Sequence, residues 1–120
     1  MQEQGLSETE QAMMRQKLMD RLASAHDEME QAADVVRSKA DDLWEIDEPI
    51  GSGTEREMAL ARQEIVRVRI DELEAALERL DEGTYGICAE CGHRIPWERL
   101  QIIPETRHCV RCESNLKEGT

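Results

Sequence analysis

Large aromatic side chains are scarce in this chain of 120 residues, which has no phenylalanine, one tyrosine and two tryptophans. A bulky aromatic core is therefore excluded. No run approaches the roughly 18 consecutive apolar residues that a membrane-spanning helix needs, so we predict no membrane partner. The first residues contain neither a basic segment nor an apolar stretch and do not resemble a secretory signal. We therefore expect a cytoplasmic protein, in a reducing compartment where cysteines stay free or bind metal.

Basic residues are also scarce, and they are unevenly placed. Residues 1–82 carry 22 acidic and 10 basic side chains, whereas residues 83–120 carry five of each, so the net charge of −12 arises entirely before residue 83. Affinity for nucleic acids depends largely on lysines and arginines that replace phosphate counterions. We therefore predict no direct binding of nucleic acid. An acidic chain is better suited to a basic protein surface, which its charge would help it to find.

The cysteines form two pairs with the spacing C-x2-C-x17-C-x2-C, at Cys88, Cys91, Cys109 and Cys112. This spacing is typical of a site in which four thiolates hold one zinc ion, at about 2.3 Å from each sulfur. Four thiolates fill all the positions of a tetrahedral ion, so we predict one structural Zn²⁺, no catalytic residue and no enzyme activity. His93 and His108 are expected beside the site and not as ligands. A disulfide or a thiol redox switch remains the alternative.

Two long helices are predicted before the cysteines. Ser7 and Glu10 form a capping box, which predicts a helix from about residue 8 to 46. Thr54 and Glu57 form a second capping box, and Gly83 is a natural end for the helix that follows. Both helices carry apolar residues at alternating spacings of three and four, with polar Gln63 at one position of the second stripe: Leu18, Leu22, Ala25, Met29, Ala32 and Val36, then Ala59, Val66, Ile70, Leu73, Leu77 and Leu80. Such stripes are typical of helices that pair.

The predicted fold is mainly α. Residues 1–82 form a long, acidic, antiparallel helical hairpin (coiled coil) with its tip at about 47–53, where proline and glycines break the helix. Residues 83–120 form a small C-terminal four-cysteine zinc finger with a short terminal helix. We expect a monomer, since both helices lie in one chain with a turn between them. A self-associating coiled coil is the alternative use of the same stripes.

The finger resembles that of the DksA/TraR family of bacterial transcription factors. The resemblance rests on the run from Gly83 to Gly92, with later positions that also match: Ile95, Arg99, Leu100, Pro104, Cys109 and Cys112. It covers about the last third of the chain, and the preceding hairpin agrees with it in architecture.

The resemblance implies a regulator that binds RNA polymerase and inserts the acidic hairpin tip into the secondary channel, toward the catalytic magnesium. The zinc finger would then brace the base of the hairpin. Acidic residues at and near the tip are the expected partner-binding residues there: Asp41, Asp42, Glu45, Asp47 and Glu48. Arg99 is the expected partner-binding residue at the base.

Two departures from the family refine this expectation. Residues 45–50 are acidic but lack the Asp-x-x-Asp-x-Ala pattern of other members. Members that respond to guanosine tetraphosphate have basic residues where this chain has Ile103 and Glu113, so we predict no such response. The alternative function is a non-enzymatic, zinc-containing coiled-coil adaptor or stress protein with a different protein partner.

Overall fold

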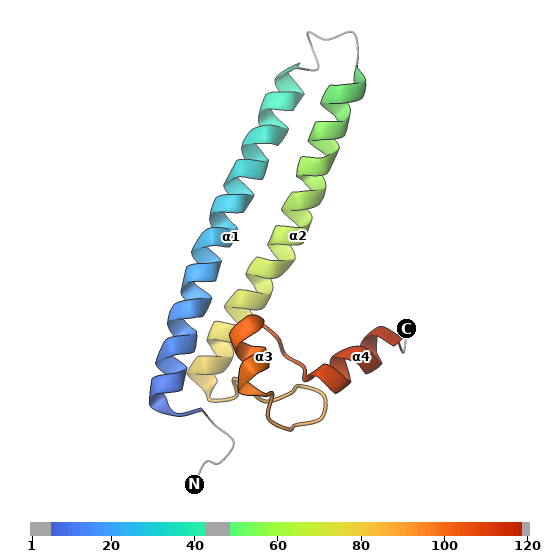
Figure 1. Ribbon diagram of the computed structural model, residues 1–120. Helices are drawn as coiled ribbons and strands as arrows, with labels where there is room; N and C mark the ends of the chain where they lie inside the picture. Colours follow the sequence, from blue (N-terminus) through green and yellow to red (C-terminus); the bar gives the residue numbers. More distant parts are fainter. Residues whose placement is uncertain (1–5, 43–48, 119–120) are drawn as a thin grey trace. The chain divides into compact units, whose positions relative to one another are not determined.

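The computed structural model describes residues 6–42 and 49–118, and it describes side chains within residues 6–38 and 55–116. Its helices are α1 (Glu8–Asp42), α2 (Pro49–Glu82), α3 (Trp97–Ile102) and α4 (Val110–Glu118) (Figure 1). Within these residues, the isolated antiparallel bridge between Ile87 and Arg94 is the only β-type pairing. The predicted mainly α fold is therefore confirmed. No helix in the described part of the chain combines the length and apolar character of a membrane span.

The two long helices begin differently from each other. At the start of α1, the Ser7 N–H donates to Glu10 Oε1 and the Glu10 N–H donates to Ser7 Oγ, both at 3.0 Å, which confirms the predicted capping box. By contrast, α2 begins at Pro49, so the start predicted at Thr54 is wrong. Proline suits a first helical turn because its missing N–H has no partner to lose there. The tip predicted at 47–53 is thus helical from residue 49, and residues 43–48 lie outside the described part.

The chain divides into two compact units. The hairpin unit is Leu22–Asp71, and the finger unit joins Met1–Arg21 to Glu72–Thr120. Both long helices pass through both units. The predicted division into 1–82 and 83–120 therefore stays a prediction.

In each unit α1 and α2 pair along their apolar stripes. The hairpin unit buries small residues from both helices, among them Ala25 and Ala32 of α1 and Ala59 of α2. The finger unit buries Met14, Leu18, Leu73, Ala76 and Leu80. Ion pairs join Arg15 to Asp81 at 3.0 Å in the finger unit and Glu28 to Arg69 at 3.3 Å in the hairpin unit. A residue later in α1 thus pairs with a residue earlier in α2. The two helices are therefore antiparallel, as predicted.

The first turns of α1 also contact the finger. Lys17 Nζ donates to the Gln101 carbonyl at 2.9 Å, and Arg21 Nη1 donates to the Ile102 carbonyl at 3.4 Å. These carbonyls end the short helix α3, where free carbonyls need partners and positive charge is favourable. A Cβ on Gly86 would lie 3.6 Å from Leu100 and 3.9 Å from Leu6, so the chain before α1 also lies close to the finger. Helix α1 therefore holds α3 in place.

Candidate metal centre

The first pair of cysteines lies in a tight turn that follows the end of α2. Gly83 ends the helix with a φ of 83°, and the Thr84 N–H donates to the Arg79 carbonyl at 2.9 Å. The turn itself is closed by hydrogen bonds from Cys88 N–H to the His93 carbonyl at 2.8 Å and from Gly92 N–H to the Cys88 carbonyl at 2.9 Å. Gly92 has a φ of 78°, a conformation that residues with a Cβ rarely adopt. The backbone thus directs both sulfurs to one side.

The second pair lies at the start of α4. Cys112 is inside this helix, and the Glu113 N–H donates to the Cys109 carbonyl at 2.9 Å. Two hydrogen bonds join the second pair to the first. The Ala89 N–H donates to the Arg107 carbonyl at 2.8 Å, and the Cys109 N–H donates to Cys88 Sγ at 3.4 Å. These contacts bring four cysteines from two distant segments to one point.

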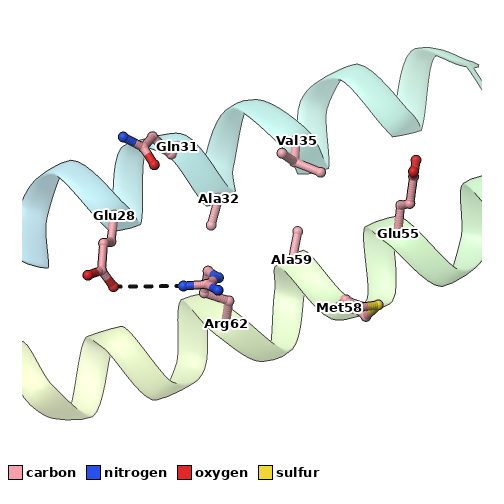
Figure 2. A pocket seen from close by; sticks show the side chains of 8 residues that line it. All are labelled: Glu28, Gln31, Ala32, Val35, Glu55, Met58, Ala59 and Arg62. Carbon is pink, nitrogen blue, oxygen red and sulfur yellow. Dashed lines mark ion pairs between the residues drawn. The ribbon is translucent and has the colours of Figure 1, made fainter.

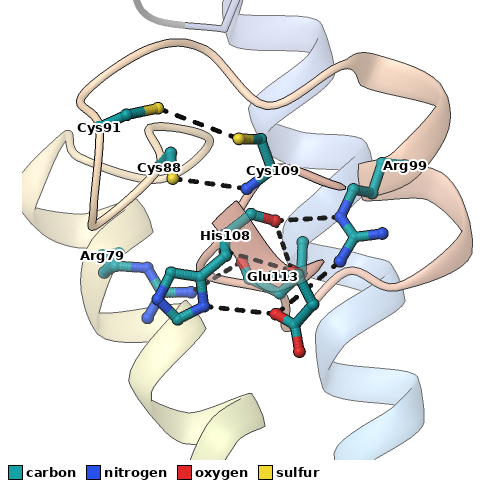
Figure 3. A network of polar contacts seen from close by, with 8 residues as sticks. Arg79, Cys88, Cys91, Arg99, His108, Cys109 and Glu113 are labelled. Atoms are coloured by element: carbon teal, nitrogen blue, oxygen red, sulfur yellow. Dashed lines mark hydrogen bonds and ion pairs between the residues drawn. The ribbon is translucent and has the colours of Figure 1, made fainter. Parts of the chain in front are cut away.

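The four sulfur atoms lie within 4.8 Å of one another. Cys91 Sγ lies 3.9 Å from Cys109 Sγ (Figure 3). Sulfurs on a tetrahedron about 2.3 Å from a zinc ion are about 3.8 Å apart, so this set fits the ion. None of these four cysteines forms a disulfide. Among the described residues, this is the only group of metal-ligating side chains so arranged, and it contains no histidine. The site is a structural zinc centre of the four-thiolate type.

Protons are unequally held by these thiols. Burial by itself raises the pKa of the Cys88 thiol, but backbone hydrogen bonds from Cys91, Cys109 and Glu90 outweigh it and lower the pKa to about 6. Hydrogen bonding by the neighbouring Cys109 thiol, with burial, raises the pKa of Cys112 to about 12. Because zinc binds thiolates, loading the site must release the proton that Cys112 otherwise keeps.

Arg99 connects α3 to the second cysteine turn. Its Nε donates to the His108 carbonyl at 3.0 Å, and its Nη2 lies 4.0 Å from Glu113 Oε1 (Figure 3). His108 Nδ1 lies 3.4 Å from the same carboxylate oxygen. Only 18% of the Arg99 side chain is exposed. Its contacts therefore brace the residue that precedes Cys109, whatever further role it has with a partner.

A hollow of about 290 Å³ opens beside Arg99, His108 and Glu113. Its lining carries charges of both signs: the acids Glu72, Glu105 and Glu113, and the arginines Arg99 and Arg107, together with His108. Ile103, at one of the two positions that the family resemblance expects to be basic in members that respond to guanosine tetraphosphate, also lines it. The other such position is held by Glu113.

The structure does not place the predicted tip side chains. Asp41 and Asp42 form the end of α1, with backbone positions only, and Glu45, Asp47 and Glu48 lie outside the described residues. One buried residue was missed by the sequence reasoning. Tyr85 is 3% exposed, and its hydroxyl donates to the Pro104 carbonyl at 2.8 Å. The available signal in the sequence was that this residue is the only tyrosine and lies just before the first cysteine turn.

Comparisons with known proteins agree with this geometry. Residues 83–114 match the family described as prokaryotic dksA/traR C4-type zinc finger. General stress protein 16O of Bacillus subtilis is 36% identical over 56 residues, 47% of this chain and 34% of that protein. The RNA polymerase-binding transcription factor DksA of Haemophilus influenzae is 27% identical over 89 residues, 72% of this chain and 61% of that protein. The chain thus spans about a third of the first relative and less than two thirds of the second.

Among solved structures, the transcription factor DksA2 from Pseudomonas aeruginosa superposes with a TM-score of 0.82. The superposition covers 93% of this chain and 86% of that one, at 24% sequence identity. At this identity the likeness establishes the fold, which extends over both the paired helices and the finger.

Proposed function

Since residues 83–114 match the dksA/traR C4-type zinc finger and the chain has the fold of DksA2, we propose that it is a transcription regulator that binds RNA polymerase. In this proposal the acidic end of the hairpin enters the secondary channel, and the zinc centre fixes the base of the hairpin. The protein acts in the cytoplasm, on a protein partner, without enzyme activity and without direct contact to nucleic acid. The observation that carries the proposal is the joining of this finger to a pair of long antiparallel helices in one fold.

The charge distribution of the chain supports insertion of the hairpin into a channel that leads to a metal ion. All of the excess negative charge lies in residues 1–82, which include the two long helices. Five acids lie within residues 41–48, at the connection between α1 and α2. A narrow helical hairpin with carboxylates at its end is suited to approach a metal ion inside a channel, because the attraction grows where water is excluded.

Binding is tested by competition on core RNA polymerase. The zinc-loaded protein is expected to displace a labelled protein already known to occupy the secondary channel, at a concentration close to its own dissociation constant. Binding to polymerase without displacement would place it elsewhere on the enzyme and overturn the channel proposal.

The role of the tip is tested separately. Asp47→Asn with Glu48→Gln should leave polymerase binding intact and remove the effect on transcription from a responsive promoter. The control changes Glu74 and Glu78 to glutamine, which removes the same charge from exposed positions of α2 close to the finger. If the tip variant no longer binds polymerase, the tip is an anchor and our assignment of roles is wrong.

The hollow beside Arg99 supports the proposal that guanosine tetraphosphate is not an effector. A polyphosphate there would meet the Glu113 carboxylate, 3.4 Å from His108 Nδ1, in place of a basic side chain. Repulsion between the phosphate charges and this carboxylate disfavours binding. Labelled nucleotide should bind the protein–polymerase complex no better than polymerase alone. A clear gain on adding this protein would refute the proposal.

A second candidate is an adaptor that acts in stress and uses another protein partner. The observation in its favour is the 36% identity to general stress protein 16O, over 56 residues. Affinity capture separates the two functions. An adaptor retains a partner other than polymerase, and that binding resists the tip substitutions.

A further inference from the structure

Helix α2 carries a second apolar stripe besides the one that pairs with α1. Met58, Ala61, Ile65 and Val68 are spaced by three, four and three residues, so they lie along one face of the helix. All four are exposed, with 66% of Met58, 60% of Ile65 and 48% of Val68 accessible. The stripe lies wholly within the hairpin unit.

The stripe continues into a groove between α1 and α2. Ala32 and Ala59, which project toward each other from the two helices, leave an open space of about 630 Å³ that Val35 and Met58 border (Figure 2). Val35 is itself 39% exposed. Single exposed apolar residues are ordinary, but a row in heptad register beside an apolar groove is typical of a surface that another helix covers.

Charges on the two sides of the stripe select what covers it. One side of the stripe carries an acidic row at heptad position g, directly before each position a: Glu57, Glu64 and Asp71. Arg62 and Arg69 follow the other side. In a parallel pair of helices, a residue of the acidic row faces a residue of the arginine row in the partner helix, and the number of that partner residue is higher by five.

The pairs that this rule creates between two copies of α2 are favourable. Glu57 faces Arg62 of the second copy, and Glu64 faces Arg69 of the second copy. In an antiparallel pair each row faces itself, so acids meet acids and arginines meet arginines. The sequence of α2 is therefore complementary to itself in the parallel orientation.

We propose that a second copy of this chain covers the stripe, with the two α2 helices parallel. Arg62 and Arg69 now lie 3.9 and 3.3 Å from Glu28, and 64% and 42% of their side chains remain exposed, so both can face a second carboxylate. The contact spans 11 residues, about 16 Å of helix. A contact this short belongs to the weak class, and the dimer forms only at high protein concentration. This inference does not depend on the proposed function.

The association is measured by sedimentation velocity of the zinc-loaded chain over a range of concentrations. The wild type should change from one chain to two as the concentration rises, and Ile65→Glu should raise the dissociation constant about tenfold or more. Leu60→Glu is the matched control, because Leu60 is 40% exposed on the opposite side of the same helix. It should leave the association unchanged. Both variants change exposed residues, and circular dichroism verifies that each is folded.

The orientation is tested by charge reversal. Glu64→Arg should weaken the dimer, and Arg69→Glu added to it should restore the dimer by exchanging the two charges. An antiparallel dimer would not be weakened by Glu64→Arg, since changing one charge in acidic rows that already face each other adds no repulsion. That result overturns the parallel arrangement. A mass of one chain up to about 1 mM overturns the dimer itself. If the wild type stays monomeric and Ile65→Glu lowers affinity for polymerase, the stripe faces polymerase and not a second copy.

Discussion

At the residue scale, the buried Tyr85 hydroxyl fixes the first cysteine turn to the segment after α3. Its hydrogen bond to the Pro104 carbonyl, at 2.8 Å, spans 19 positions of the sequence. Tyr85→Phe keeps the ring but leaves that carbonyl without a partner in a buried place. We expect a loss of about 1–2 kcal/mol in the free energy of unfolding, measured by urea denaturation of the zinc-loaded protein. An unchanged midpoint would mean that water replaces the hydroxyl.

The same hydroxyl predicts a sensitivity to alkaline pH. Burial raises the pKa of Tyr85 far above the ordinary value of 10.0, and the positive charge of Arg79 offsets only part of this. Because the folded state holds the proton more tightly, the stabilisation is complete below about pH 10 and is lost as pH rises toward the folded-state pKa. The stability difference between wild type and Tyr85→Phe should shrink above pH 10. A constant difference would contradict this account.

Arg99 is predicted to retain zinc in addition to any contact with a partner. Lysine cannot reproduce a guanidinium that donates to the His108 carbonyl while also facing Glu113. Arg99→Lys should therefore release zinc to a chelator several-fold faster than the wild type, followed with a metallochromic dye. Arg111→Lys, at an exposed position between the last two cysteines, is the control. If the two variants release zinc at equal rates, Arg99 has no special role in retaining the ion.

At the element scale, the start of α1 depends on one capping residue. Ser7 Oγ accepts from the Glu10 N–H at 3.0 Å, so Ser7→Ala leaves this amide without its partner. We expect a loss of about 1 kcal/mol in the free energy of unfolding, measured by urea denaturation. Thr9→Ala changes an exposed residue of the first turn that makes no cap, and it should have little effect. Equal losses for the two variants would remove the special role of Ser7.

Local patterns predicted the elements well because each depends on neighbours in sequence. The stripe at Leu18, Ala25 and Ala32 is buried as expected, and the spacing of the cysteines gave the metal site. The start of α2 was misplaced because Pro49 and two glycines resemble a turn, although proline also suits a first helical turn. The contact of Lys17 with the Gln101 carbonyl spans 84 positions. No pattern within one segment encodes such a contact.

At the scale of the whole molecule, we expect the zinc ion to stabilise more than the residues between the cysteines. The finger unit includes Met1–Arg21, and Lys17 and Arg21 donate to the carbonyls that end α3. The finger itself has a small apolar core, in which Tyr85, Ile95 and Leu100 are buried. Metal binding should therefore supply much of its folding free energy. The first turns of α1 should lose contacts when the metal leaves.

Removal of zinc by a chelator, or Cys109→Ser, tests this coupling by hydrogen exchange. Amide protection should fall throughout residues 83–118 and also in residues 8–21, whereas residues 25–38 and 55–71 should keep theirs. The hairpin unit keeps its protection because the burial of Ala25, Ala32, Ala59 and Val66 does not involve the finger. Loss of protection along the whole of both helices would instead show one cooperative unit. Unchanged protection in residues 8–21 would show that the paired helices, not the zinc centre, hold the start of α1.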